Sequence, residues 1–330
     1  MNTSDQNRIN VTDMWKLLAY IQKKLVYSIP AAMIVGLLGG YLFDVSFLQV
    51  FILPLTILMI YPMMVNLQIN KVLSGGDIKV QLVTLFINFA IIPFVAFGIG
   101  RLFFADDPMF ALGLLLIGLI PTSGMTISWT GIAKGNLDAA IKMTVLGLAI
   151  GSLATPLYAQ WLMGAAIDIP LHQIFQRIIL IVFVPMIAGY LTQRIIIYKY
   201  GFEKYREDIS RKFPLLSLLG VLGIVMVALA LRAEVIITQP AVLIYVLLSL
   251  IIFYGFNYMI STVIGKYFFH REDGIALVYG TSMRNLSIAL AVAMTVFGPE
   301  ASDIALIISL AFIVQVQSSV YHVKYADNLI

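Results

Sequence analysis

The chain has 330 residues, of which 61% are apolar and 12% are charged, and its mean hydropathy is +0.96. Soluble proteins carry about 25% charged residues, so this composition excludes a water-soluble globule and also a disordered chain. The absence of cysteine excludes disulfides, thiolate metal sites and cysteine nucleophiles. The net charge of +4 does not indicate a nucleic-acid partner, because membrane proteins concentrate Lys and Arg in cytoplasmic loops.

Ten apolar runs follow one another along the chain, and each is long enough for an α-helix to cross a bilayer. They lack the alternation of polar and apolar residues that marks a membrane β-barrel. The sequence therefore predicts an all-α, multi-pass protein of the plasma or inner cell membrane with ten transmembrane helices. The runs cover residues 26–43, 47–65, 80–100, 108–130, 138–163, 173–191, 213–231, 240–262, 274–297 and 302–321.

The distribution of positive charge predicts the orientation. Seventeen Lys and Arg residues fall in alternate loops on one side, only three fall on the other, and Arg284 lies within a run. Because Lys and Arg concentrate on the cytoplasmic side, both termini are expected there. Residues 1–25 then form a cytoplasmic N-terminal segment and residues 324–330 a cytoplasmic tail.

The runs divide into two sets of five, over residues 26–163 and 164–323. With an odd number of helices in each half, the second half enters the membrane from the opposite side, which is the geometry of an inverted repeat. The segment 192–212 carries nine charges and is expected to be a solvated cytoplasmic linker within the second half.

The fourth and ninth runs are interrupted near their centres by similar motifs. Ser123 and Ser282, one in each motif, are 159 residues apart, close to half the chain. Proline removes a backbone donor and glycine permits non-helical dihedrals. Matched breaks in two inverted halves point to a central transport site, whereas a single break is more often a simple kink. The motifs read Pro121-Thr122-Ser123-Gly124-Met125-Thr126 and Gly280-Thr281-Ser282-Met283-Arg284-Asn285.

Arg284 is the most unusual single residue. A guanidinium at the centre of a membrane span costs roughly 2.5–3.5 kcal/mol on insertion scales, and it stays protonated. It needs partners, and the adjacent runs offer no carboxylate at its depth. Two interpretations stay open. Arg284 is either a fixed internal cation that satisfies carbonyl groups near Ile120 and Gly280, or part of an anion-binding site.

Polar residues on neighbouring runs either join helices by hydrogen bonds or line the same cavity. The three histidines are scattered near run ends, and no nucleophile–base pair lies at membrane depth, so we expect no metal site, no cofactor and no enzyme. The polar residues are Asn88, Thr144, Asn257, Gln315 and Gln317.

Three motifs carry a resemblance to a known family. They are residues 59–64, residues 121–125 followed by Trp129 and 134–136, and residues 285–293 ending at 296–298; the stretch 219–240 is similar too. They resemble the arsenical-resistance arsenite permeases of the bile acid/sodium symporter superfamily, over nearly the whole chain. The resemblance implies ten spans with discontinuous fourth and ninth helices. It also implies a core domain of spans 3–5 and 8–10 that moves against a panel domain.

The resemblance also implies differences at functional positions. Arsenite permeases have a cysteine, and the sodium-coupled branch has acidic and hydroxyl sodium ligands, at positions that this chain fills otherwise. Thr122 stands in place of the cysteine, Ser287 and Gln315 in place of two glutamates, Gly280 and Arg284 in place of a glutamate and a glutamine that help hold sodium, and Ala140 in place of one hydroxyl, while Thr144 keeps another.

We expect a secondary transporter of a small solute or organic anion that works by alternating access around Thr122–Thr126 and Thr281–Ser287. Hydroxyl and amide groups there would bind the solute, and the N-termini of the second half-helices would present positive dipole ends. One alternative is an arsenite efflux permease without the usual cysteine. Another, of a different class, is a membrane receptor or sensor that binds a ligand without transporting it. The sequence leaves the substrate, the direction and any role of sodium open.

Overall fold

The computed structural model describes residues 11–70, 76–167, 169–238, 240–297 and 301–329. Within these ranges its elements are helices and one isolated β-bridge. The helices of the first half are α1 (Val11–Lys23), α2 (Leu25–Leu42), η1 (Ser46–Phe51), α3 (Ile52–Val65), α4 (Ile78–Phe86), η3 (Ile87–Ile91), α5 (Ile92–Phe103), α6 (Pro108–Leu119), α7 (Gly124–Ile132) and α8 (Leu137–Met163). Those of the second half are α9 (Leu171–Ile178), η4 (Ile179–Phe183), α10 (Val184–Tyr200), α11 (Phe202–Lys204), η5 (Tyr205–Ile209), α12 (Ser210–Leu231), α13 (Ala233–Thr238), α14 (Ala241–Phe268), α15 (Arg271–Ser282), α16 (Leu286–Val296) and α17 (Ala301–Leu329).

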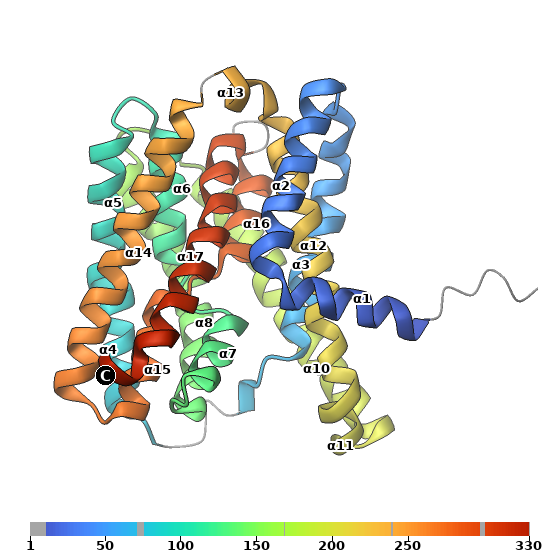
Figure 1. The fold of residues 1–330 in the computed structure, drawn as a ribbon, viewed down its shortest axis with the longest axis vertical. Coiled ribbons are helices and arrows are strands. Elements are labelled where there is room, and N and C mark those ends of the chain that lie inside the picture. The colour runs from blue at the N-terminus through green and yellow to red at the C-terminus, as the bar shows by residue number, and fades with distance from the viewer. Residues whose placement is uncertain (1–10, 71–75, 168, 239, 298–300, 330) are drawn as a thin grey trace, which may run out of the picture.

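The helices form two packed groups (Figure 1). On one side, α12 packs along α2 and α3, and α10 packs on α3. On the other, α4, α5 and α14 pack around the broken pairs α6–α7 and α15–α16, with α8 among them. The long helix α17 crosses between the groups and contacts α6, α12, α14 and α16. The seam between the two groups runs along α16 and α17.

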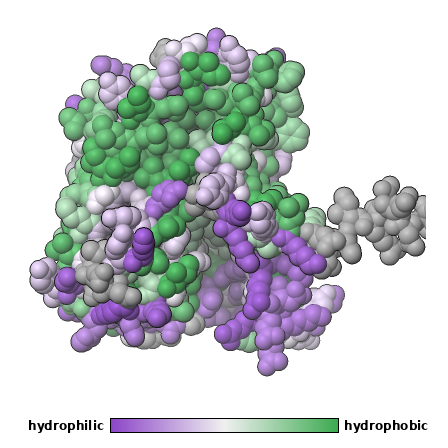
Figure 2. Space-filling model, viewed as in Figure 1, coloured by the Kyte–Doolittle hydropathy of each residue, from purple (hydrophilic) through white to green (hydrophobic). Residues whose placement is uncertain are grey.

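Seven helices among the described residues are long and apolar enough to cross a membrane, or eight when the bent pair α1–α2 is included. The two short apolar helices 108–119 and 286–296 belong to the expected fourth and ninth spans, and each of those spans is made of two helices. Large apolar side chains are exposed along α10 and α14, as expected for surfaces that face lipid. Figure 2 shows apolar residues over the upper part of this face and hydrophilic residues at the end that carries α11.

Two segments differ from the sequence-based expectation. The segment 192–212, expected to be a solvated linker between two spans, is mostly helical. The helix α10 continues to Tyr200, and the next helix starts after Gly201, whose φ of 85° ends α10. Ahead of the first expected span, α1 forms a separate helix that meets α2 at 99°. With 13 residues, α1 lies wholly within the segment 1–25 that was expected ahead of the first span.

Two glycines on α2 set the contact with α12. A methyl group built on Gly36 would overlap the backbone of Met226, and one built on Gly40 would overlap the backbone of Ala230. Small residues four positions apart let membrane helices approach closely. We expect Gly40→Ala to lower the free energy of unfolding by about 1–3 kcal/mol, because the backbone of α12 has to move away.

The neighbouring residue supplies the control for this prediction. A methyl group on Gly39 meets no atom within 4 Å, so Gly39→Ala should leave stability unchanged or raise it slightly through helix propensity. Thermal melting of the two purified variants in the same detergent measures the difference. Equal melting temperatures would show that the close approach of α2 and α12 contributes nothing to stability.

Candidate functional site

The two broken helix pairs cross at their breaks, where the backbones pair. Residues 120–123 separate α6 from α7, and residues 283–285 separate α15 from α16. The breaks form an antiparallel bridge between Pro121 and Arg284. Two reciprocal hydrogen bonds flank it, from Thr122 N to Met283 O at 2.7 Å and from Asn285 N to Ile120 O at 2.9 Å. Each break therefore supplies the hydrogen-bond partners that the other lost when its helix ended.

Thr122 is the residue under backbone strain at this crossing. Its φ is 60°, a left-handed conformation that β-branched residues rarely adopt. Its hydroxyl donates to Pro121 O at 2.7 Å and lies 3.3 Å from Thr144 O on α8. Because α8 has Gly147 against the Thr122 side chain, the two can approach closely. The side chain of Thr122 therefore points toward α8.

The second helix of each pair begins at the crossing with a side-chain cap. Ser123 Oγ accepts from Met125 N at 3.2 Å, and Ser123 N donates to Thr126 Oγ1, which completes a capping box for α7. Asn285 Oδ1 accepts from Ile288 N at 3.2 Å at the start of α16. Thr126 N donates to Ser123 O at 2.9 Å, whereas the first N–H groups of an α-helix, here those of Gly124, Leu286 and Ser287, have no acceptor within their own helix. Two helix N-termini, each with a partial positive charge, thus meet at one place.

Arg284 is fully buried, and its guanidinium binds the carbonyl ends of both first half-helices. Nε donates to Ile117 O at 3.0 Å and one terminal nitrogen donates to Thr281 O at 2.8 Å. The other terminal nitrogen donates to Gly118 O. Because the last carbonyls of a helix carry partial negative charge, this cation stabilises the C-terminal ends of α6 and α15 together. The interpretation of Arg284 as a fixed internal cation matches this geometry.

Asn88 and Gln315 complete the environment of Arg284. Asn88 lies in the π-helical turn η3, where its Oδ1 accepts from Arg284 at 2.6 Å and its Nδ2 donates to Gly280 O at 3.0 Å. Gln315 on α17 binds the Arg284 backbone at both ends, accepting from N at 2.8 Å and donating to O at 3.3 Å. The break of α15–α16 is therefore held by side chains from two further helices.

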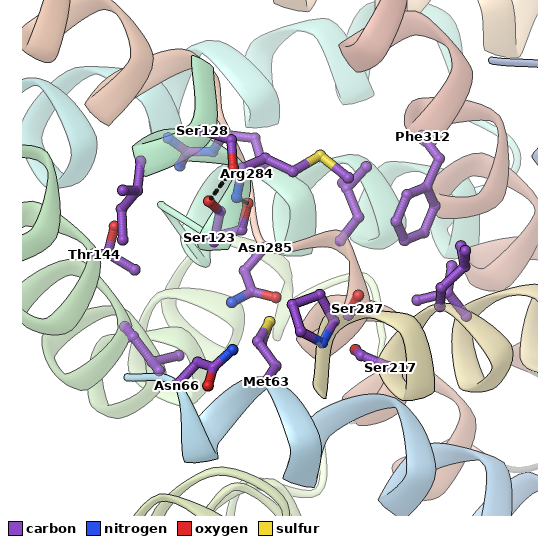
Figure 3. Close-up of a pocket in the computed structure, with 18 of the residues that line it drawn as sticks. Met63, Asn66, Ser123, Ser128, Thr144, Ser217, Arg284, Asn285, Ser287 and Phe312 are labelled. Carbon is purple, nitrogen blue, oxygen red and sulfur yellow. Dashed lines mark hydrogen bonds between the residues drawn. The ribbon is translucent and has the colours of Figure 1, made fainter. Parts of the chain in front are cut away.

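A cavity of about 360 Å³ lies beside the crossing. The N-termini of α7 and α16 form one wall, and α3 and α12 form the opposite wall (Figure 3). Figure 3 places Ser123 and Asn285 on the first wall and Met63, Asn66 and Ser217 across from them. Gln22 of α1, Asn66 and Ser128 of α7 line its outer part, so the cavity extends toward the end of the molecule that carries α1 and α7.

Residues 53–239 match the Sodium Bile acid symporter family. The chain belongs to this family. It is 26% identical to "Arsenical-resistance protein Acr3" of Alkaliphilus metalliredigens (strain QYMF) over 316 residues, which cover 88% of this chain and 87% of that protein. It is also 26% identical to "Uncharacterized sodium-dependent transporter YocS" of Bacillus subtilis (strain 168) over 211 residues, 62% of each chain. A second Acr3, from Corynebacterium glutamicum, is 21% identical over 259 residues, 75% of this chain and 70% of that protein.

The family membership confirms several expectations from the sequence. This bile acid symporter family protein is a multi-pass membrane protein and a secondary transporter, not an enzyme. A small transported solute follows from the family.

About half of the residues expected at the site of this transporter line the cavity. The lining residues among them are Ser123, Gly124, Met125, Thr144, Arg284, Asn285, Ser287 and Gln315. The guanidinium of Arg284 itself is enclosed by its oxygen partners and is not exposed to the cavity. The other expected residues lie in or behind the crossing and outside the cavity lining: Pro121, Thr122, Thr126, Gly280, Thr281, Ser282, Asn88 and Asn257.

Asn257 was expected at the site but does not line the cavity. Its side chain is fully buried on α14, and neither of its polar atoms has a hydrogen-bond partner in the part of the chain that the structure describes. Thr281, by contrast, is joined to Ser261 of α14 at 2.5 Å, so its hydroxyl connects two helices.

The wall formed by α3 and α12 was missed as part of the site. Its residues are mostly apolar and look like ordinary membrane-helix sequence, although Met63 and Met64 belong to a motif that carried the family resemblance. The missed lining residues on these two helices and their flanks are Met63, Met64, Asn66, Leu67, Pro214, Ser217, Leu218 and Val221.

Proposed function

We propose that this protein transports a small organic anion by alternating access through the cavity beside the crossing. The observation that carries the proposal is that the capped N-termini of α7 and α16 meet on one wall of the cavity. Helix N-termini attract anions through their free N–H groups and their dipole. None of the lining residues is Asp or Glu, so nothing on the described walls repels a carboxylate or sulfonate.

A second cavity supports the alternating-access part of the proposal. It has a volume of about 420 Å³ and lies toward the C-terminal end of α16, where Met294 and Thr295 line it. Both cavities have α12 on one wall and α16 on the other. A relative movement of the two helix groups along this seam would open one cavity and close the other, which is the motion that an alternating-access carrier requires.

We further propose that transport is independent of sodium. The guanidinium of Arg284 takes four oxygen partners at the crossing, the kind of ligand set that a bound cation would need. A second positive charge about 4 Å away would be repelled by about 4 kcal/mol at an effective dielectric of 20. At about 1.4 kcal/mol per tenfold change, sodium affinity would fall nearly a thousandfold.

The ten-helix inverted repeat is part of the same proposal. At the crossing each break donates one backbone hydrogen bond to the other and accepts one from it. This equivalence supports a two-fold relation between residues 26–163 and 164–323. The seventeen-to-three bias of Lys and Arg supports cytoplasmic termini, with the cavity of Figure 3 then open toward the cytoplasm.

An arsenite exporter is the second candidate, because two relatives carry the name Acr3. Trivalent arsenic prefers thiolate sulfur, which this chain does not contain. The side chain at the position of the family cysteine, Thr122, also points toward α8. We expect cells that express the protein to gain little arsenite resistance, and Thr122→Cys to add little. Strong resistance in a growth assay with arsenite would favour the exporter instead.

Uptake by proteoliposomes tests the proposed function directly. The purified protein is supplied in turn with taurocholate, short-chain carboxylates and arsenite, each in sodium and in choline medium. We expect saturable uptake of an organic anion at the same rate in both media. Saturable binding without uptake would identify a receptor, and uptake that requires sodium would contradict the role proposed for Arg284.

A further inference from the structure

A ladder of three hydrogen bonds joins α14 to α17 and ends at a buried histidine. Its rungs connect equivalent turns of the two helices. They run from Tyr254 OH to Gln315 Oε1 at 2.9 Å, between Tyr258 OH and Ser319 Oγ at 2.9 Å, and between Thr262 Oγ1 and His322 Nε2 at 3.2 Å. The first rung lies at the cavity and the last near the C-terminal end of α17.

The hydrogen-bond partners of His322 are compatible with either protonation state of the ring. Nδ1 lies 3.1 Å from Tyr279 OH and Nε2 lies beside the Thr262 hydroxyl. Because hydroxyl groups both donate and accept, the neutral ring and the doubly protonated ring can each satisfy both nitrogens. Tyr258 stacks on the ring at 5.0 Å and Tyr279 meets it edge-on at 5.5 Å, so aromatic groups lie against a positive imidazolium.

Few other titratable groups face the ring. On α14 the nearest is Tyr258, and Lys266 is exposed one turn beyond Thr262. On α15 the nearest titratable group is Tyr279, and the charged residues 271–273 lie two turns earlier in the helix. The Asp273 carboxylate accepts a hydrogen bond from Asn136. On α17 itself Lys324 is exposed, and α7 has no titratable side chain. Among the described residues, none of the hydrogen bonds or ring contacts of His322 involves a carboxylate.

The ladder gives the ring a physical connection to the crossing. Tyr258 stacks on His322 and also binds Ser319. Ser319 Oγ in turn contacts Met283 Sδ at 3.5 Å and Gln315 O at 2.7 Å. Met283 belongs to the break whose carbonyl binds Thr122 N. If a change in the charge of the ring moves Tyr258, the movement is passed to Ser319 and from Ser319 to Met283 in the break and to Gln315 in the cavity wall.

We propose that His322 is a proton-binding site whose protonation state is transmitted to the cavity through this ladder, so that protons are the ions available to couple transport. Imidazole is the side chain whose charge ordinarily changes between about pH 5 and 8. The link to transport rests on the function proposed above, with Arg284 in the place of a metal cation. The proton site itself depends only on the ladder.

Nuclear magnetic resonance tests the site without any solute. The chain has three histidines and fifteen methionines, so selective ¹³C labelling of histidine rings and methionine methyl groups, in lipid nanodiscs, gives few signals. His322→Gln assigns the signal of His322, and His172→Gln and His270→Gln assign the two exposed rings, which serve as controls. We expect the His322 signal to titrate as the pH is lowered, with the Met283 methyl moving at the same midpoint.

A variant separates proton binding from transmission. Tyr258→Phe keeps the stacked ring but removes the hydroxyl that binds Ser319, so the titration of His322 should persist while the shift of Met283 is lost. A His322 signal that stays constant over the whole pH range in which the protein remains folded would overturn the proposal. A titrating ring with an unmoved Met283 methyl in the wild type would overturn it as well. Failure of solute uptake would leave these signals unaffected, so the two proposals fail separately.

Discussion

Replacing Arg284 with glutamine is expected to destabilise the protein strongly and to make its stability sensitive to sodium. The substitution leaves up to four oxygen atoms at the crossing without their donor. Each buried unsatisfied group costs about 1–3 kcal/mol, partly offset because the buried charge is gone. We expect a net loss of about 3 kcal/mol in the free energy of unfolding. Sodium should recover part of it by binding the vacated oxygens, whereas choline is too large to do so.

Two further variants make this prediction specific. Arg284→Lys retains a charge but not the planar set of donors, so its stability should lie between that of the wild type and that of the glutamine variant. Arg101→Gln removes an arginine that is exposed at the end of α5 and should change nothing. Melting temperatures in sodium and choline salts check all three. An Arg284→Gln variant as stable as the wild type would show that the guanidinium does not hold the crossing.

Filling the cavity from the α12 side is expected to abolish transport. Ser217 lies on the wall opposite Asn285, and its hydroxyl donates to Met59 O of α3. Ser217→Trp would place an indole in a space of about 360 Å³ that the solute has to occupy. We expect uptake by proteoliposomes to fall to background, while the protein remains folded because the added bulk enters open space.

Leu219→Trp is the matched control, two residues further along α12. Leu219 is 37% exposed on the outside of the helix and does not line the cavity. Its uptake should equal that of the wild type, measured with the solute found in the uptake screen. If both tryptophan variants transport normally, the solute follows another route through the protein.

The breaks in the fourth and ninth spans were predictable because their cause is local. Pro121 lies within the first break and Gly280 lies in the last turn of the helix before the second, and the matched spacing of the two motifs needs no knowledge of packing. The helical structure on both sides of Gly201 in residues 192–212 was not predictable in the same way. Charged residues are typical of loops and of helices that extend beyond a membrane, and only Gly201 marks the junction.

The residues of the candidate site likewise include some that were predictable from the sequence and some that were not. Ser123, Asn285 and Ser287 were predictable because hydroxyl and amide groups at membrane depth are unusual. Met63 and Leu218 were not, because an apolar side chain that lines a cavity has the same sequence pattern as one that packs in a core. The directions of the side chains within a break were not predictable either, because they depend on the backbone dihedrals of the break. Thr122 was expected to line the cavity like its neighbour Ser123, but its φ of 60° turns its hydroxyl toward α8.

Equilibrium binding of ²²Na⁺ to the purified protein, with the Arg284→Gln variant in parallel, tests most directly whether Arg284 takes the place of a transported cation. With the guanidinium bound to Ile117 O and Thr281 O, we expect no saturable sodium binding to the wild type and saturable binding to the variant. Saturable binding of sodium to the wild type would contradict the account.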